Sequence, residues 1–116
     1  MVLIYDNFNF LSDIDNEFYL FSCMTIDLEY AKKILTRKKY LSMLTENSTA
    51  NLLKNLLSIH IGTKKTDFRI DYDLAPTVIV FIPLLKQKYY SIGDIDKIKR
   101  EKLYKIYLVN IENILD

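Results

Sequence analysis

A run of polar residues at positions 45–49, Thr-Glu-Asn-Ser-Thr, comes directly before a set of leucines at helical spacing. These leucines fall on one side of a helix and predict a buried stripe: Leu52, Leu53, Leu56 and Leu57. Asn47, Ser48 and Thr49 can hydrogen-bond the free backbone N–H groups of a first helical turn. The start of a helix also attracts anions, because its free N–H groups face outward there. We therefore expect a helix over about residues 48–58 with a candidate anion site at its start.

Few other residues have side chains that could take part in catalysis or metal binding. His60 is the only histidine and stands between two isoleucines, which predicts a histidine at the edge of the core. Cys23 is the only cysteine and lies in an apolar run, so we expect it to be buried as a small hydrophobe. No intramolecular disulfide or cysteine-based zinc site can form. Two close pairs of aspartates suit turns and helix caps: Asp71 with Asp73, and Asp94 with Asp96. These residues alone give no sign of catalysis, and no catalytic residue, metal ligand or cofactor is expected.

The pattern along the chain predicts the elements that position these residues. Apolar or alternating runs predict strands at 2–5, 18–24 (a candidate edge strand), 68–72, 77–82 and 104–111, with a short strand at 40–44 as an option. The run 77–82 is the most continuously apolar and is expected to be the central strand. Residues 7–16 predict a packed loop, with one helical turn as an option. Helices are expected at 28–37 after Asp27, over 48–58, and after Ser91, where Ile92, Ile95 and Ile98 would form the buried stripe. The fold class is therefore α/β (α+β), with a mixed sheet of about five strands flanked by three helices.

Length and charge narrow the range of functions. The 116 residues suffice for one domain, 1–116, with half of them hydrophobic. A formal net charge of +1 argues against nucleic acid as the main ligand, because non-specific phosphate binding needs a basic excess. No apolar run approaches the roughly 20 residues of a membrane span, and no signal peptide is evident.

The segment at 45–49 and the order of elements resemble the anti-CRISPR ring nucleases of crenarchaeal viruses. Members of that family open their middle helix with Gly-His-Asp/Glu-Ser-Thr-x-x-Leu, where this chain has Thr45-Glu46-Asn47-Ser48-Thr49 and then Ala50-Asn51-Leu52. The first strand followed by Asn7 resembles the family's Asn-containing loop, and the resemblance covers nearly the whole chain. It implies an α/β domain that forms a homodimer. In active relatives the dimer cleft encloses cyclic tetra-adenylate, and the histidine acts as general acid.

Two departures from the family lie in this expected pocket. Glu46 stands at the histidine position, and an exposed carboxylate is ionised at neutral pH, so it has no proton to give. Leu84-Leu85-Lys86-Gln87-Lys88 stands where active relatives have Arg-Leu-Glu-Glu-Gly, with Leu85 at the arginine position. A lysine meets a phosphate without the bidentate geometry of arginine. The resemblance therefore implies a degenerate ligand pocket: Asn7, Glu46, Asn47, Ser48, Thr49, Lys86 and Lys88.

Three functions remain open from the sequence. The first is a catalytically inactive viral protein of anti-CRISPR type, acting in the host cytoplasm by binding a host CRISPR effector component, with type III as the expected target. The second is sequestration of a cyclic oligoadenylate without cleavage. The third is residual ring nuclease activity with Glu46 as base or His60 as acid.

Overall fold

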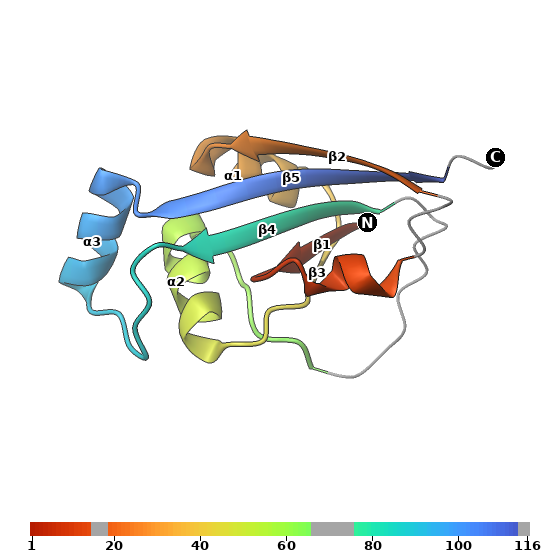
Figure 1. Ribbon diagram of the computed structural model, residues 1–116. Coiled ribbons are helices and arrows are strands. Elements are labelled where there is room, and N and C mark those ends of the chain that lie inside the picture. Colours follow the sequence, from red (N-terminus) through yellow and green to blue (C-terminus); the bar gives the residue numbers. More distant parts are fainter. Residues whose placement is uncertain (15–18, 66–75, 114–116) are drawn as a thin grey trace.

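The computed structural model describes residues 1–14, 19–65 and 76–113, which form one five-stranded sheet with helices on it (Figure 1). The strands are β1 (Val2–Tyr5), β2 (Tyr19–Ile26), β3 (Tyr40–Ser42), β4 (Thr77–Pro83) and β5 (Tyr104–Asn113). The helices are α1 (Leu28–Arg37), α2 (Asn47–Leu57), α3 (Ile92–Glu101) and the short 3-10 helix η1 (Asn9–Asp13). The predicted α+β class, with five strands and three α-helices, is confirmed.

The sheet is mixed, with the order β2-β5-β4-β1-β3. β1 runs parallel to both β3 and β4, whereas β5 is antiparallel to β4 and β2 is antiparallel to β5. β4 is the middle strand, and its side chains from Val78 to Phe81 are buried. The prediction of a central strand over 77–82 is therefore confirmed, as is the prediction that β2 lies at an edge.

Each face of the sheet has its own apolar core, because successive side chains of a strand point to opposite faces. On one face Ile4, Ile79 and Ile106 pack with the apolar stripes of α1, α2 and α3. On the other face Leu3, Val78 and Val109 pack with aromatic and aliphatic side chains from η1 and its flanks. Figure 1 shows η1 and α1 on opposite sides of the sheet.

Two helices begin as the sequence predicted. Asp27 caps α1, where its carboxylate accepts the Tyr30 N–H at 2.7 Å. Ser91 and Asp94 form a reciprocal capping box at α3, with N–H to oxygen distances of 3.1 Å and 2.9 Å. These bonds lower the pKa of the Asp94 carboxyl below its ordinary value.

Three predictions of burial are wrong. Cys23 is exposed, because β2 is the outermost strand of the sheet. His60 is exposed, while its neighbour Ile61 is buried and Ile59 is half-buried. Ile92 is 82% exposed, because the first turn of α3 extends beyond the sheet and only Ile98 reaches full burial. The predicted strand over 68–72 lies outside the described residues. No helix in the described part of the chain has both the length and the apolarity to cross a bilayer.

Candidate functional site

The carboxyl ends of β1, β3 and β4 lie at the same edge of the sheet, because these three strands are parallel neighbours. Open sheets with parallel strands commonly bind ligands at this edge. The chain leaves β1 at Asp6, passes from β3 into the start of α2, and leaves β4 into the segment 84–91. The candidate site is built from these three connections.

Asp6 hydrogen-bonds the connection after β1 to the connection between β3 and α2. Its carboxylate accepts the backbone N–H of Thr45 at 2.9 Å and that of Glu46 at 3.3 Å. It also accepts the Thr45 hydroxyl, at 3.0 Å to Oδ2 and 3.2 Å to Oδ1. The backbone N–H groups just before α2, where a bound anion was expected, thus donate to a carboxylate of the protein itself.

Asn7 supports this arrangement from the next position. Its side-chain Nδ2 donates to Asp6 Oδ1 at 2.8 Å, and its Oδ1 accepts the Asn9 N–H at 2.9 Å. The first bond orients the Asp6 carboxylate and the second forms the turn into η1. Asn7 therefore lies beside Asp6 at this edge of the sheet, and both the nitrogen and the oxygen of its side-chain amide are bonded within the loop.

The start of α2 differs from the sequence-based expectation in one respect. The helix begins at Asn47, so Glu46 is the N-cap residue, and its side chain makes no capping hydrogen bond. Asn47, Ser48 and Thr49 lie inside the first turn, where they do not act as caps. Thr49 is only 4% exposed, since it lies on the buried side of the helix with the leucines. Glu46 and Asn47 are exposed.

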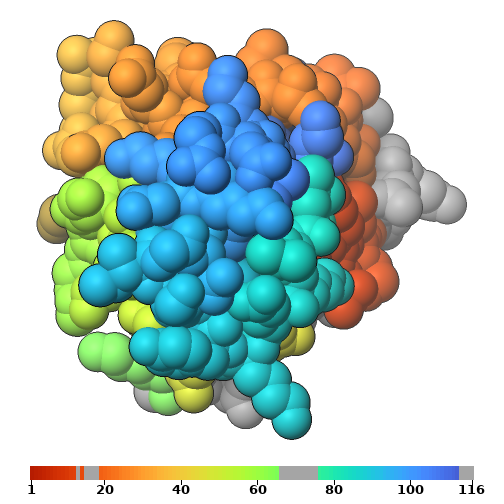
Figure 2. Space-filling model, turned by 90° about the vertical axis from the view of Figure 1, so that its left-hand side faces the viewer, coloured from red at the N-terminus to blue at the C-terminus, as the bar shows by residue number. Residues whose placement is uncertain are grey.

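A surface hollow of about 370 Å³ lies beside α2 and collects part of the predicted site. Its wall includes Asn47, Ser48, Asn51 and Lys54 of α2, the segment Ile61–Thr63, and Lys88, Tyr89 and Tyr90 after β4. Figure 2 faces this end of the molecule, with the segment after β4 in cyan beside the yellow and light green of residues 47–65. The predicted residues Asn47, Ser48 and Lys88 thus meet at one hollow, whereas Asn7, Glu46, Thr49 and Lys86 are not part of its wall.

The segment after β4 is held in shape by a buried tyrosine. Tyr90 is 4% exposed, and its hydroxyl donates to the Leu85 carbonyl at 2.6 Å and accepts the Gln87 N–H at 3.2 Å. Tyr89, the next residue back, is 75% exposed. The bonded Tyr90 therefore fixes a loop that carries Lys88 and Tyr89 at the rim of the hollow.

His60 lies away from this edge. It follows the carboxyl end of α2, and a helix of 11 residues is about 16 Å long. His60 lines a separate hollow with Lys54, Asn55, Ser58 and Ile59. Among the described residues, no group of three histidine, cysteine or carboxylate side chains is placed to hold a metal ion.

The sequence did not single out Asp6 as a member of the site. An available signal was its place directly after the first strand, since such positions meet at the carboxyl edge of a parallel sheet. What it bonds there depends on the position of residue 45, which the local sequence does not specify.

A comparison with solved structures finds the same fold in B116 of Sulfolobus turreted icosahedral virus. The two chains superpose with a TM-score of 0.69 over 93% of this chain and 97% of B116, at 13% sequence identity. At that identity the likeness establishes a shared fold with a viral protein and nothing finer. No protein-family model matches the chain, and no curated protein sequence does.

Proposed function

We propose that this protein is a non-catalytic viral inhibitor of CRISPR immunity that binds a component of the host effector machinery in the host cytoplasm. The observation that carries the proposal is the Asp6 carboxylate at the start of α2, bonded to the N–H groups of Thr45 and Glu46. A ring nuclease needs this region to accept phosphate and to supply a proton. In this protein the carboxyl groups of Asp6 and Glu46 lie at the start of α2, and carboxylates repel phosphates.

The proposed target is a type III effector complex, an expectation that rests on the resemblance of the chain to the anti-CRISPR ring nucleases. The fold shared with B116 supports a viral origin. Protein binding is also favoured by the exposed side chains of Met24, Tyr30 and Tyr89, because aromatic and methionine side chains are enriched at protein interfaces.

The test is direct binding to a purified type III effector complex of a Sulfolobus host. We expect the tagged protein to co-elute with the complex in size-exclusion chromatography and to restore plating of a virus targeted by that complex. Neither effect is expected with a type I effector complex as the control. Absence of both co-elution and restored plating would refute the proposal.

A second function is favoured by the hollow beside α2. Its wall offers the ammonium groups of Lys54 and Lys88, amide and hydroxyl groups, and the exposed ring of Tyr89, with no carboxylate among the residues that line it. Lysines pair with phosphates and an aromatic ring stacks on a base, so the hollow suits sequestration of a cyclic oligoadenylate.

Calorimetry with cyclic tetra-adenylate at moderate salt separates the two functions. Sequestration predicts measurable heat that is lost in the Lys54→Ala/Lys88→Ala variant. Lys86→Ala is the matched control, because Lys86 is an exposed lysine of the same segment outside the wall of the hollow. No heat with the wild-type protein would end this second proposal and leave the first intact.

A further inference from the structure

The positive charge of the chain is concentrated at one end of the molecule. Residues 84–105 hold seven lysines and arginines and three acids, a net charge of +4, while the other 94 residues hold nine and twelve, a net charge of −3. All seven cationic side chains of this segment are exposed. Residues 84–102, the connection after β4 together with α3 and its cap, are called the α3 end below, and Figure 2 faces them, in cyan to light blue. The nearly neutral chain therefore has a basic surface at one end.

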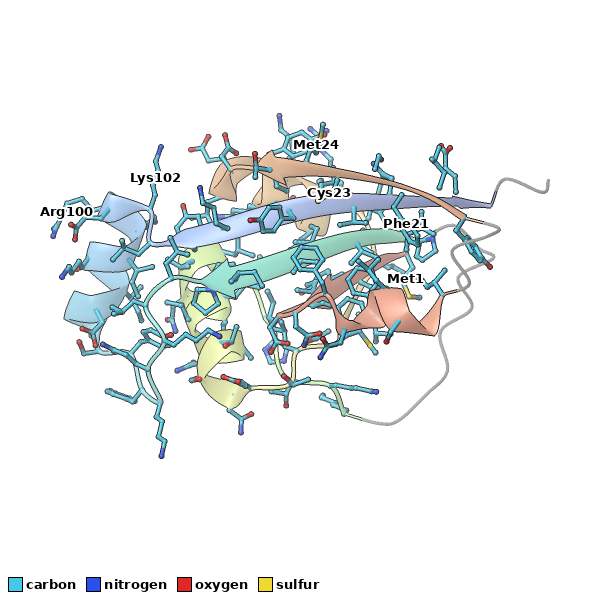
Figure 3. All side chains as sticks on the ribbon, viewed as in Figure 1. Met1, Phe21, Cys23, Met24, Arg100 and Lys102 are labelled. Carbon is cyan, nitrogen blue, oxygen red and sulfur yellow. The ribbon has the colours of Figure 1, made fainter. Side chains whose placement is uncertain are left out.

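Several cations of the α3 end point away from the core. Ile98 is the fully buried residue of α3, and successive side chains turn by about 100°, so Arg100 faces outward. Lys99 lies on the same side of the helix as Ile92, seven positions earlier. The side chains of Lys99, Arg100 and Lys102 make no hydrogen bond or ion pair with the described part of the chain. Figure 3 shows Arg100 and Lys102 projecting from this end of the molecule.

Large apolar side chains face water on the same surface. Leu84 is 56% exposed, Tyr89 75% and Ile92 82%. Leu84 lies beside the carboxyl end of α3, because its N–H donates to the Leu103 carbonyl at 3.0 Å. Tyr89 and Ile92 lie at the start of this helix, which is about 15 Å long. Monomeric proteins usually expose such side chains singly, and a group of them rimmed by charged residues marks an interaction site.

The α3 end is held in shape by hydrogen bonds within it. The Tyr90 hydroxyl joins the Leu85 carbonyl to the Gln87 N–H, and the capping box fixes the start of α3. In the orientation that satisfies the Gln87 side-chain amide, its nitrogen donates to Asp94 Oδ2 at 3.2 Å. A surface that is ordered before binding loses little conformational entropy when a partner docks.

We propose that the α3 end is a docking surface for an acidic protein surface. Carboxylates of the partner pair with Lys99, Arg100 and Lys102, and its apolar side chains cover the exposed ones beside them. The excess of cations at this end is what selects an acidic partner. The proposal rests on the proposed function, since the partner surface belongs to a protein subunit of the type III effector complex.

Two observations favour a protein over nucleic acid at this surface. Asp96 and Glu101 are exposed among the cations of α3, where they would repel phosphates, whereas a protein can offer them cations of its own. Leu84 and Ile92 are aliphatic and cannot stack on a base as an aromatic ring does. The surface therefore suits a partner with mixed charges, mainly acidic, around apolar side chains.

Zero-length crosslinking with the purified type III effector complex tests the chemistry of the contact. A carbodiimide joins an ammonium group to a carboxylate only where the two are in direct contact. We expect links from Lys99 or Lys102 to aspartates or glutamates of an effector subunit, identified by mass spectrometry of the peptides. Lys32 and Lys33, exposed on α1, are the internal control and should give none. Links from α1 alone, or no links in the bound complex, would overturn the proposal.

Charge reversal measures the strength of the contact. Lys99→Glu/Arg100→Glu should bind the complex at least about 10-fold more weakly than the wild type, because attraction becomes repulsion. Lys32→Glu/Lys33→Glu makes the same change of charge on α1 and should bind as the wild type does. Lys102→Gly should weaken binding without lowering the melting temperature, since residue 102 is left-handed, with φ of 53°, and glycine suits that conformation better than lysine.

The outcomes separate this surface from the proposed function. Equal weakening by both double variants would assign the effect to net charge alone. Release of the bound protein by an excess of single-stranded RNA would assign the surface to nucleic acid. Either result overturns the docking surface and leaves the proposed function in place, whereas a wild type that does not bind the effector complex refutes both.

Discussion

The Asp6 carboxylate and Thr45 are bonded twice, through the backbone N–H at 2.9 Å and the hydroxyl at 3.0 Å, although 39 positions separate them in the chain. The pair joins the carboxyl end of β1 to the connection between β3 and α2. It fixes the start of α2 with a negative charge of the protein itself. This relationship underlies the first two predictions.

Asp6→Ala is expected to destabilise the protein by about 1–3 kcal/mol, because hydrogen bonds to a charged acceptor are lost and the N–H groups of Thr45 and Glu46 lose their partner. Thr45→Val should cost less, about 0.5–1.5 kcal/mol, since it removes only the hydroxyl bonds. Urea unfolding followed by circular dichroism measures both. Equal stability of Asp6→Ala and wild type would show that the pair does not hold the two connections together.

Removing the charge of Asp6 should also change ligand preference. Asp6→Asn is expected to bind cyclic tetra-adenylate more tightly than the wild type, because one negative charge leaves the edge where the phosphates would lie. Calorimetry at two salt concentrations checks this, with a larger difference expected at low salt. Asp96→Asn, an exposed acid on α3, is the control and should not change the affinity. A gain of the same size in both variants would point to net charge alone as the cause.

The wild-type protein is expected not to cleave cyclic tetra-adenylate, and Glu46→His alone should not create cleavage. A histidine at position 46 would supply an acid, but Leu85 would still stand at the expected arginine position, and the Asp6 carboxylate would remain at the start of α2. Chromatography of labelled ligand after long incubation measures the products. Linear products from the wild type that disappear in Glu46→Ala would establish catalysis and contradict the proposed function.

The capping box of α3 gives a prediction on pH. Ser91→Ala should lower the free energy of unfolding by about 1 kcal/mol at neutral pH, the usual cost of losing an N-cap hydroxyl. The backbone N–H of Ser91 and, after it, the Ser91 hydroxyl hold the pKa of Asp94 below its ordinary value. Ser91→Ala keeps the backbone bond and loses only the contribution of the hydroxyl, which is present above the ordinary pKa and disappears as the pH falls through the lowered pKa. The difference between variant and wild type should therefore shrink in acid. Thermal melts across pH test this, and a constant difference would contradict it.

Tyr90→Phe tests the tyrosine that shapes the segment after β4. Loss of its hydroxyl frees the Leu85 carbonyl and the Gln87 N–H, at a cost of about 0.5–1.5 kcal/mol. Amide hydrogen exchange should become faster at Gln87 while the amides of β4 stay protected. Tyr89→Phe, at an exposed neighbouring ring, is the control and should leave exchange unchanged. Unchanged exchange at Gln87 in Tyr90→Phe would show that the hydroxyl does not order the segment.

The amino-acid sequence determined the local elements well. The helical spacing of apolar residues and the cap residues Asp27 and Ser91 predicted α1 over residues 28–37 and the start of α3. The continuous apolar run predicted β4 as the central strand. These features depend on neighbours within a few positions, so the sequence alone specifies them. The start of α2 was missed by one residue, because several adjacent polar residues compete as the cap and tertiary contacts decide among them.

Only the tertiary structure decided which distant residues meet. The parallel order of β3, β1 and β4 brought Asp6 to Thr45, and the path of the segment after β4 placed Lys88 at the hollow and Lys86 outside it. The position of β2 at the sheet edge exposed Cys23, although its apolar neighbours predicted burial. The burial of a side chain and the identity of the residues it contacts depend on which strand lies beside which. The full strand order is set by the packing of the whole chain, although the apolar runs already predicted a central β4 and an edge position for β2.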